Sequence, residues 1–218
     1  MAKTAKLKSE GVAMNLVEIA MKGGWIMAVL FVLSIISVAL YIERWLTIKK
    51  ASRFEEKTYI ELLRMIDNNQ TAEAAKICKL SETSICKICE LGLSSAAQDS
   101  LLAQETIEQS ANQFVRYLEK NLGTLSTLAA VAPLIGFLGT VTGMIRVFSQ
   151  LADSDAGVSL QVLSGGIWEA LVTTVGGLIV GILCIIFHNH LTTKIESIAF
   201  ILEGKISQVC LHLRRKQK

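Results

Sequence analysis

Charge and proline are both scarce in this sequence of 218 residues. Only 19% of the residues are Asp, Glu, Lys or Arg, whereas 51% are hydrophobic and the mean hydropathy is +0.47. Soluble domains carry about 25% charged residues, so this composition favours a membrane protein. The single proline, Pro133, leaves few interruptions to helices elsewhere.

A disulfide scaffold and a nucleic-acid partner are both disfavoured. The five cysteines form an odd number without the spacing of a secreted scaffold, so we expect reduced thiols. The net charge is only +3, and the 22 Lys and Arg residues are scattered over several segments. A nucleic-acid-binding protein would concentrate them in one patch.

The hydrophobic residues gather in three long stretches. Twenty uncharged residues lie between Lys22 and Glu43, and further uncharged runs cover residues 121–145 and 170–193. About 20 apolar residues suffice for a helix to cross the roughly 30 Å of hydrocarbon in a bilayer. The first run is too long for a cleaved signal peptide, so we expect three retained spans. Aromatic residues of the interfacial type flank the first: Trp25, Tyr41 and Trp45.

The distribution of Lys and Arg predicts the orientation. Three spans place the loop after the first span on the same side as the C-terminal tail, and these segments carry 11 and 6 basic residues. The N-terminal segment and the loop after the second span carry 4 and 1. Because basic loops stay in the cytoplasm, we expect the long loop and the tail to be cytoplasmic and the N-terminus to lie outside.

The cytoplasmic segments have the composition of helices. Turn and N-cap residue types at 67–71 and 81–84 divide the long loop, and an apolar stripe ending in Leu118 and Leu122 predicts a helix that runs unbroken into the second span. A second stripe makes the tail an amphipathic helix, buried either by other copies or within the chain. The two stripes are Leu102, Ile107, Phe114, Leu118 and Leu122, and Leu191, Ile195, Ile198, Leu202, Ile206, Val209 and Leu213.

Cysteine and histidine offer two candidate sites. Cys78, Cys86 and Cys89 could place three thiols on one helical face for a metal or for redox chemistry, but four ligands are wanted and no histidine is near. Buried structural cysteines are the favoured interpretation, and we expect no metal or cofactor. His188 and His190 lie two residues apart and point to different helix faces, so interfacial packing is favoured over joint metal binding or proton exit.

Small and hydroxyl residues fill the second and third apolar runs. The small residues allow helix backbones to approach closely, and Pro133 should kink the second span. The threonines either bond a carbonyl one turn back or line a pore. The packing residues are Pro133, Gly136, Gly139, Gly143, Gly177 and Gly181, and the hydroxyl residues are Thr140, Thr142, Thr173 and Thr174.

Glu169 is the one acidic residue between Asp155 and Lys194. It lies either at the interface beside Trp168 or within the helix bundle. In the second position burial would favour its protonated form, which suits a proton path.

Two segments carry a resemblance to a known family. AAVAPLIGFLGTVTGMIRVF, residues 129–148, and GGIWEALVTTVGGLIVGI, residues 165–182, closely resemble the MotA/TolQ/ExbB proton channel family. Three spans with an outside N-terminus agree with its ExbB and TolQ members, ExbB most of all. By position, Glu169, Thr140 and Thr174 match the polar pore-lining residues of the family, whereas Thr142 replaces a bulky residue that some relatives have after GTV.

The resemblance implies an all-α integral membrane protein that assembles as a homopentamer in a bacterial inner membrane. The pentamer would surround the single helices of two ExbD- or TolR-like subunits, whose aspartate carries protons. Proton flow would then drive a TonB-like protein for outer-membrane import, or a TolA-like protein for envelope maintenance. The chain would be a stator and not an enzyme.

The sequence thus predicts seven segments. They are a periplasmic N-terminal segment at 1–22, spans at 23–45, 122–145 and 159–193, a cytoplasmic helical domain at 46–121, a periplasmic loop at 146–158, and a cytoplasmic helix at 194–218. A scaffold that conducts no protons remains an alternative. A solute carrier is disfavoured because it would show internal repeats or broken helices.

Overall fold

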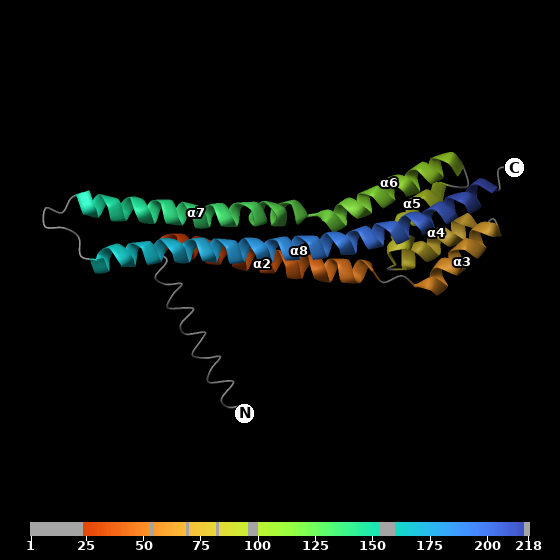
Figure 1. Cartoon of the computed structure of the whole chain (residues 1–218). Coiled ribbons are helices and arrows are strands. Elements are labelled where there is room, and N and C mark those ends of the chain that lie inside the picture. Colours follow the sequence, from red (N-terminus) through yellow and green to blue (C-terminus); the bar gives the residue numbers. More distant parts are fainter. Residues whose placement is uncertain are drawn as a thin grey trace, which may run out of the picture. The chain divides into compact units, whose positions relative to one another are not determined.

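The structure is a computed structural model that describes residues 24–52, 55–68, 70–81, 83–95, 100–152 and 160–215. The predicted segment 1–22 lies outside these residues. Every regular element in the described part of the chain is an α-helix (Figure 1). The helices are α2 (Gly24–Ala51), α3 (Glu56–Asp67), α4 (Thr71–Leu80), α5 (Ser84–Ser95), α6 (Ser100–Glu119), α7 (Leu122–Ala152) and α8 (Leu160–Arg215).

The chain forms two compact units, and both α2 and α8 contribute to each of them. The first unit contains the chain up to Leu40 and Gly123–His188, so it consists of most of α2, α7 and the first half of α8. The second unit contains Tyr41–Leu122 and Asn189–Lys218, that is, the end of α2, helices α3 to α6 and the rest of α8.

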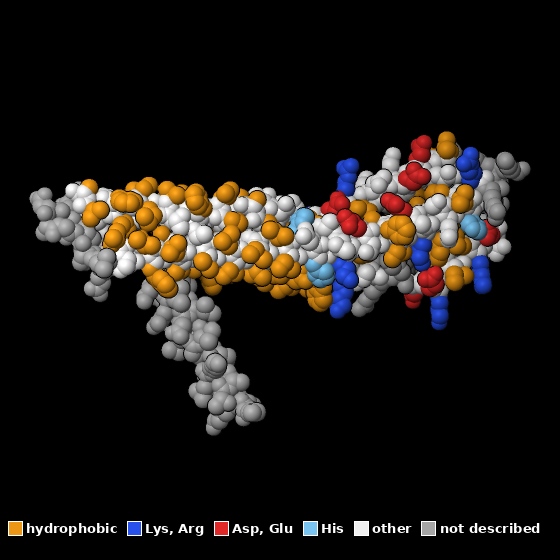
Figure 2. Space-filling model, in the orientation of Figure 1, with side chains coloured by type: hydrophobic (Ala, Val, Ile, Leu, Met, Phe, Trp, Pro, Cys, Tyr) orange, Lys and Arg blue, Asp and Glu red, His pale blue; other side chains and the backbone are white. Residues whose placement is uncertain are grey.

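The first unit is apolar on its outside as well as its inside. Its buried cluster is small and consists of Ile26, Leu30, Ala132, Val180 and Cys184. Large apolar side chains such as Phe31, Leu134 and Phe137 are more than half exposed, and orange side chains cover α7, α8 and α2 in Figure 2. An apolar exterior requires an apolar solvent or further helices.

Three stretches of helix among the described residues are long and apolar enough to cross a membrane: α2, the region of α6 and α7, and α8. The predicted fold class, an all-α integral membrane protein with three spanning helices, is confirmed. The helices are longer than the predicted spans: α7 continues through Arg146 to Ala152, and α8 runs without a break to Arg215.

The second unit has a conventional core. The amphipathic helices α3, α4 and α5 follow one another at the turns predicted from residues 67–71 and 81–84, and α5 also packs on α6. Leu62, Ile66, Leu93, Ile107 and Leu118 are at most 1% exposed. Charged side chains gather over this part of the molecule in Figure 2, as expected for a surface that faces water.

Polar contacts attach α3 to α8 within the second unit. The Tyr59 hydroxyl donates to Oε1 of Gln208 at 2.7 Å, and Lys205 Nζ lies 3.3 Å from Oε2 of Glu56. His212 Nδ1 lies 2.6 Å from Oδ1 of Asp67. Burial, together with nearby Cys89 and Glu56, raises the pKa of the Tyr59 hydroxyl, which keeps it protonated as a donor.

The apolar stripe of the tail is buried inside one chain. All seven of its residues, from Leu191 to Leu213, are at most 5% exposed. The sequence allowed this stripe to be buried either by other copies or within the chain, and the structure shows burial within the chain.

The prediction of an unbroken helix into the second span is wrong. α6 ends at Glu119 and α7 begins at Leu122, and Asn121 between them has a φ of 66°. That left-handed conformation ends a helix, and asparagine is among the few residues that adopt it readily. Arg44 from α2, 5% exposed, donates from Nη1 to the carbonyl of Tyr117 in the last turn of α6 at 3.3 Å. The stripe also begins later than predicted, because Leu102 is half exposed.

Candidate functional site

Glycines bring α7 and α8 into backbone contact in the first unit. A methyl group added at Gly177 would lie 2.7 Å from the carbonyl oxygen of Ala132 and 2.8 Å from Cα of Gly136. One added at Gly136 would lie 2.8 Å from the carbonyl oxygen of Thr173. Glycine permits such approach because it has no side chain. Gly139 and Gly143 continue the seam against Thr173 and Ala170.

Pro133 occupies the space that a side chain at Gly181 would need. Its Cγ would lie 2.6 Å from a methyl group at Gly181, and α7 remains helical through the proline. A proline inside a helix leaves the carbonyl four residues earlier without its usual donor. That carbonyl belongs to Ala129, and it also faces Gly181, at 3.2 Å from the added methyl group.

The threonines bond carbonyls on their own helix, across the seam, or both. Thr140, Thr142 and Thr173 donate to carbonyls about one turn back on their own helices, those of Phe137 at 2.7 Å, Leu138 at 2.9 Å and Ala170 at 2.7 Å. Thr174 reaches across the seam and donates to the carbonyl of Gly136 at 3.1 Å, and the Thr173 hydroxyl is also within 3.4 Å of that carbonyl oxygen. Thr173 is 1% exposed, so its hydroxyl lies inside the seam.

Glu169 lies at the end of the seam where α2 begins. Its Oε1 is 3.7 Å from Nη1 of Arg146 on α7. On the other side it rests against Gly24, the first residue of α2, where an added methyl group would lie 2.5 Å from the same oxygen. Gly24 has a φ of +65°, so both its conformation and its contact favour glycine. About a third of the Glu169 side chain is exposed.

A small polar notch surrounds this carboxylate. It has a volume of about 20 Å³, room for one water molecule, and α2, α7 and α8 all contribute to it. Thr142 and Arg146 line it from α7 and Thr173 from α8, whereas Thr140 and Thr174 do not border it. The structure therefore brings two of the four predicted threonines, Thr142 and Thr173, to Glu169; Thr174 lies on the seam, and Thr140 bonds its own helix outside the notch.

Arg146 and Gly24 were not recognised from the sequence. Arg146 is the one Lys or Arg between Lys120 and Lys194, which was a usable signal. A cation next to an apolar run is stabilised by an anionic partner, and among the described residues Glu169 lies 3.7 Å from it. Gly24 carries no comparable signal, because its role depends on the position of α2 against α8.

The three clustered cysteines lie on two helices, so the alternative that placed all three thiols on one helical face does not hold. Cys78 is on α4, and Cys86 and Cys89 are on α5. All three are at most 1% exposed, and all five cysteines are free thiols. Burial raises the pKa of Cys89 to about 12, and the pKa of Cys78 is also raised, first by its hydrogen bond to Cys86 and then by burial. No trio of His, Cys, Asp or Glu among the described residues could hold a metal ion.

The histidines do not share a site. His190 Nδ1 lies 2.9 Å from the hydroxyl of Tyr41, and the two rings are 5.9 Å apart. This is packing at the end of α2 within the second unit, as the sequence favoured. His188 belongs to the first unit.

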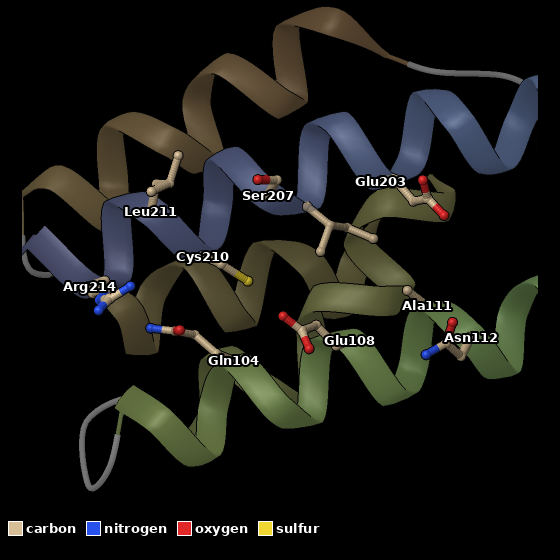
Figure 3. A pocket seen from close by; sticks show the side chains of 10 residues that line it. Gln104, Glu108, Ala111, Asn112, Glu203, Ser207, Cys210, Leu211 and Arg214 are labelled. Carbon is tan, nitrogen blue, oxygen red and sulfur yellow. The ribbon is translucent and has the colours of Figure 1, made fainter.

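An open groove of about 420 Å³ separates α6 from the end of α8 in the second unit. Figure 3 shows Gln104, Glu108 and Asn112 on the α6 side and Glu203, Ser207 and Arg214 on the α8 side. Burial and nearby Glu108 raise the pKa of Cys210 in its wall. The groove contains charged groups of both signs without a compact catalytic or metal-binding arrangement among the described residues.

Comparison with known proteins identifies the family. The MotA/TolQ/ExbB proton channel family matches residues 80–203. The chain is 29% identical over 197 residues to the biopolymer transport protein ExbB-like 3 of Synechocystis sp., covering 89% of this chain and 93% of that protein.

Two further relatives match over shorter segments. Biopolymer transport protein ExbB of Salmonella typhimurium is 31% identical over 126 residues, 56% of this chain and 51% of that protein. Tol-Pal system protein TolQ of Haemophilus influenzae is 34% identical over 87 residues, 40% of this chain and 38% of that protein. The family match covers more than half of the chain and includes the seam, Arg146 and Glu169. The chain therefore belongs to the MotA/TolQ/ExbB proton channel family.

Proposed function

We propose that this chain is the ExbB-like stator and channel-forming subunit of a motor driven by the proton-motive force. Members of the family are channel or stator subunits and not enzymes. The proposed motor lies in a bacterial inner membrane, with the N-terminus periplasmic and the second unit cytoplasmic. It energises a TonB-like protein for import across the outer membrane.

The observation that carries this proposal is the position of Glu169. It is an ionisable side chain at the end of a seam formed by glycine, alanine, threonine and Pro133, and it meets Arg146 in a notch that has room for one water. A carboxylate is costly next to hydrocarbon, so gain or loss of its proton changes which helix contacts are favourable. A membrane potential of 100 mV supplies about 2.3 kcal/mol per charge for such a cycle.

The assembly follows the pattern of the family, in which ExbB and TolQ work with ExbD or TolR and with TonB or TolA. We propose a homopentamer around the single helices of two ExbD- or TolR-like subunits. Thr140 and Thr174 line the proton path with Glu169, and Thr173 forms the wall of the notch. The principal proton carrier then belongs to the partner.

The test uses a cell in which this chain and its partner are the only such system. Glu169→Gln and Glu169→Ala should abolish energised uptake, while the assembled complex can still be purified. Glu196→Gln, the same change at an exposed position on the same helix, should leave uptake unchanged. Wild-type uptake with Glu169→Gln would contradict a role for Glu169 in the channel.

Two alternatives have distinct outcomes in the same cell. Loss of assembly in both Glu169 variants would favour a scaffold that conducts no protons, because the glycine seam alone suffices for packing. A TolQ-like subunit has a second signature: deletion of the chain would weaken the cell envelope and leave energised uptake across the outer membrane intact.

A further inference from the structure

The second unit contains a cavity that the proposed channel does not use. It lies beside the polar end of α2 and has a volume of about 750 Å³. Its wall comes from five places in the chain: α2, the residue before α3, the α4–α5 connection, the first turn of α5, and α6. The lining includes two lysines, two hydroxyl residues and two aromatic residues: Lys50, Lys87, Ser81, Thr83, Phe114 and Tyr117.

Two cations line this cavity from different helices. Lys50 is on α2 and Lys87 is on α5, and neither has an ion-pair partner among the described residues. One acid, Glu55, also borders the cavity, and its Oε2 accepts a hydrogen bond from the Thr58 hydroxyl at 2.9 Å. The lining therefore has a net positive charge, which attracts an anion.

Hydroxyl groups stand next to these lysines. Ser81 Oγ and Thr83 Oγ1 lie 2.9 Å apart in the α4–α5 connection, and the Ser81 hydroxyl also accepts from the backbone N–H of Thr83 at 3.3 Å. Lysine and hydroxyl side chains together are the usual partners of phosphate oxygens in proteins. A carboxylate ligand would require fewer partners than these, since one lysine already neutralises its charge.

Aromatic and basic side chains on α2 indicate where this cavity lies relative to lipid headgroups. Trp45 on α2 is 38% exposed, and Lys49 Nζ lies 4.9 Å from the centre of its ring. Exposed tryptophans mark the edge of the hydrocarbon, and long lysines extend from there toward water. Lys50 follows Trp45 by five residues, about 7.5 Å along the helix axis. That rise is within the thickness of one headgroup layer, roughly 5–7.5 Å on each side of the hydrocarbon.

We propose that this cavity binds the phosphate of an anionic phospholipid. Lys50 and Lys87 contact the phosphate, Ser81 and Thr83 donate to it, and Phe114 and Tyr117 cover the apolar part of the headgroup region. A bound lipid then joins the end of α2 to the start of α5. The site is independent of the proton path, because none of its residues borders the notch around Glu169.

The experiment titrates the purified full-length chain in neutral detergent with phosphatidylglycerol and with phosphatidylcholine of the same acyl chains, and native mass spectrometry measures binding. Wild type should bind phosphatidylglycerol saturably and more tightly. The double variant Lys50→Gln, Lys87→Gln should weaken this binding about 25-fold, since a lysine near an anionic lipid contributes about fivefold. The matched control, Lys76→Gln with Lys79→Gln, removes the same charge from exposed positions on α4 outside the cavity and should change binding less than about threefold.

Two outcomes would overturn the proposal. Equal losses in the two double variants would mean that binding follows net charge and not the cavity. Inorganic phosphate that displaces the lipid at the lipid's own concentration would assign the cavity to a soluble phosphate compound. Circular dichroism and melting without lipid check that the variants are folded. If the site double variant does not fold, Lys87→Gln alone decides, with an expected loss of about fivefold.

Discussion

The two units of this protein are stabilised in opposite ways. In the first, α7 and α8 meet through glycines, and large apolar side chains point outward. In the second, leucines and isoleucines fill the interior, and charged groups cover the outside. Water drives apolar side chains inward, but lipid does not, so helices in lipid associate through close packing of small residues. One chain thus uses two kinds of packing along the same helix, α8.

The largest expected effect comes from a side chain placed in the seam. Gly177→Val would put methyl groups against the backbone of Ala132 and Gly136, neither of which can rotate away. Overpacking of a core costs about 1–3 kcal/mol, and a clash with backbone should exceed that range. We expect little folded protein by size-exclusion chromatography in detergent. The control is Gly165→Val on the same helix, where an added side chain meets nothing within 4 Å, and it should behave as wild type. Equal loss of folded protein in both variants would show that close packing at Gly177 is not the cause.

Truncation of a buried leucine in the core of the second unit should have the next largest effect. Leu62 is 1% exposed, and Leu62→Ala should lower the free energy of unfolding by about 3 kcal/mol, within the range for buried leucines. Ile60→Ala on the same helix removes a side chain that is 45% exposed and should cost much less. Thermal unfolding followed by circular dichroism measures both. A similar melting temperature for the two variants would mean that α3 is not part of a core.

A single hydrogen bond between α3 and α8 should matter less. Tyr59→Phe removes the hydroxyl that donates to Gln208 and should cost about 1 kcal/mol. Tyr117→Phe, at an exposed ring, is the matched control and should change stability by less than about 0.5 kcal/mol. The comparison uses melting without lipid. An unchanged melting temperature for Tyr59→Phe would show that water replaces this bond at no cost.

The mildest probe leaves the sequence unchanged and labels the thiols of the native protein. Cys210 is partly exposed and should react first with a maleimide, whereas Cys78, Cys86, Cys89 and Cys184 are buried and should react only when their units open. Because burial and Glu108 raise the pKa of Cys210, its labelling rate should keep rising with pH beyond about 8.5, the value for a free thiol. Cys210→Ser should remove the fast phase. A rate that levels off below pH 8 would contradict the raised pKa.

Much of the fold could be predicted from local pattern alone. Long uncharged runs, the turn residues at 67–71 and 81–84, and the stripe from Leu191 to Leu213 each determine their own helix. The break between α6 and α7 could not be predicted, because the apolar stripe continues on both sides of Asn121. Only the left-handed backbone of Asn121 in the structure reveals it. The separation of Cys78 from Cys86 and Cys89 follows from the predicted turn at 81–84, which places them on different helices.

The candidate site shows the same division. The sequence by itself determined that three apolar helices exist, that Glu169 is the one acid in the last of them, and which family the flanking segments resemble, because hydrophobicity and motifs are local properties. Only the tertiary structure decided that Glu169 meets Arg146 and Gly24, that Thr174 bonds across the seam while Thr140 bonds its own helix, and that the tail stripe is buried in the same chain. These depend on how α2, α7 and α8 pack, and packing brings together residues more than a hundred positions apart.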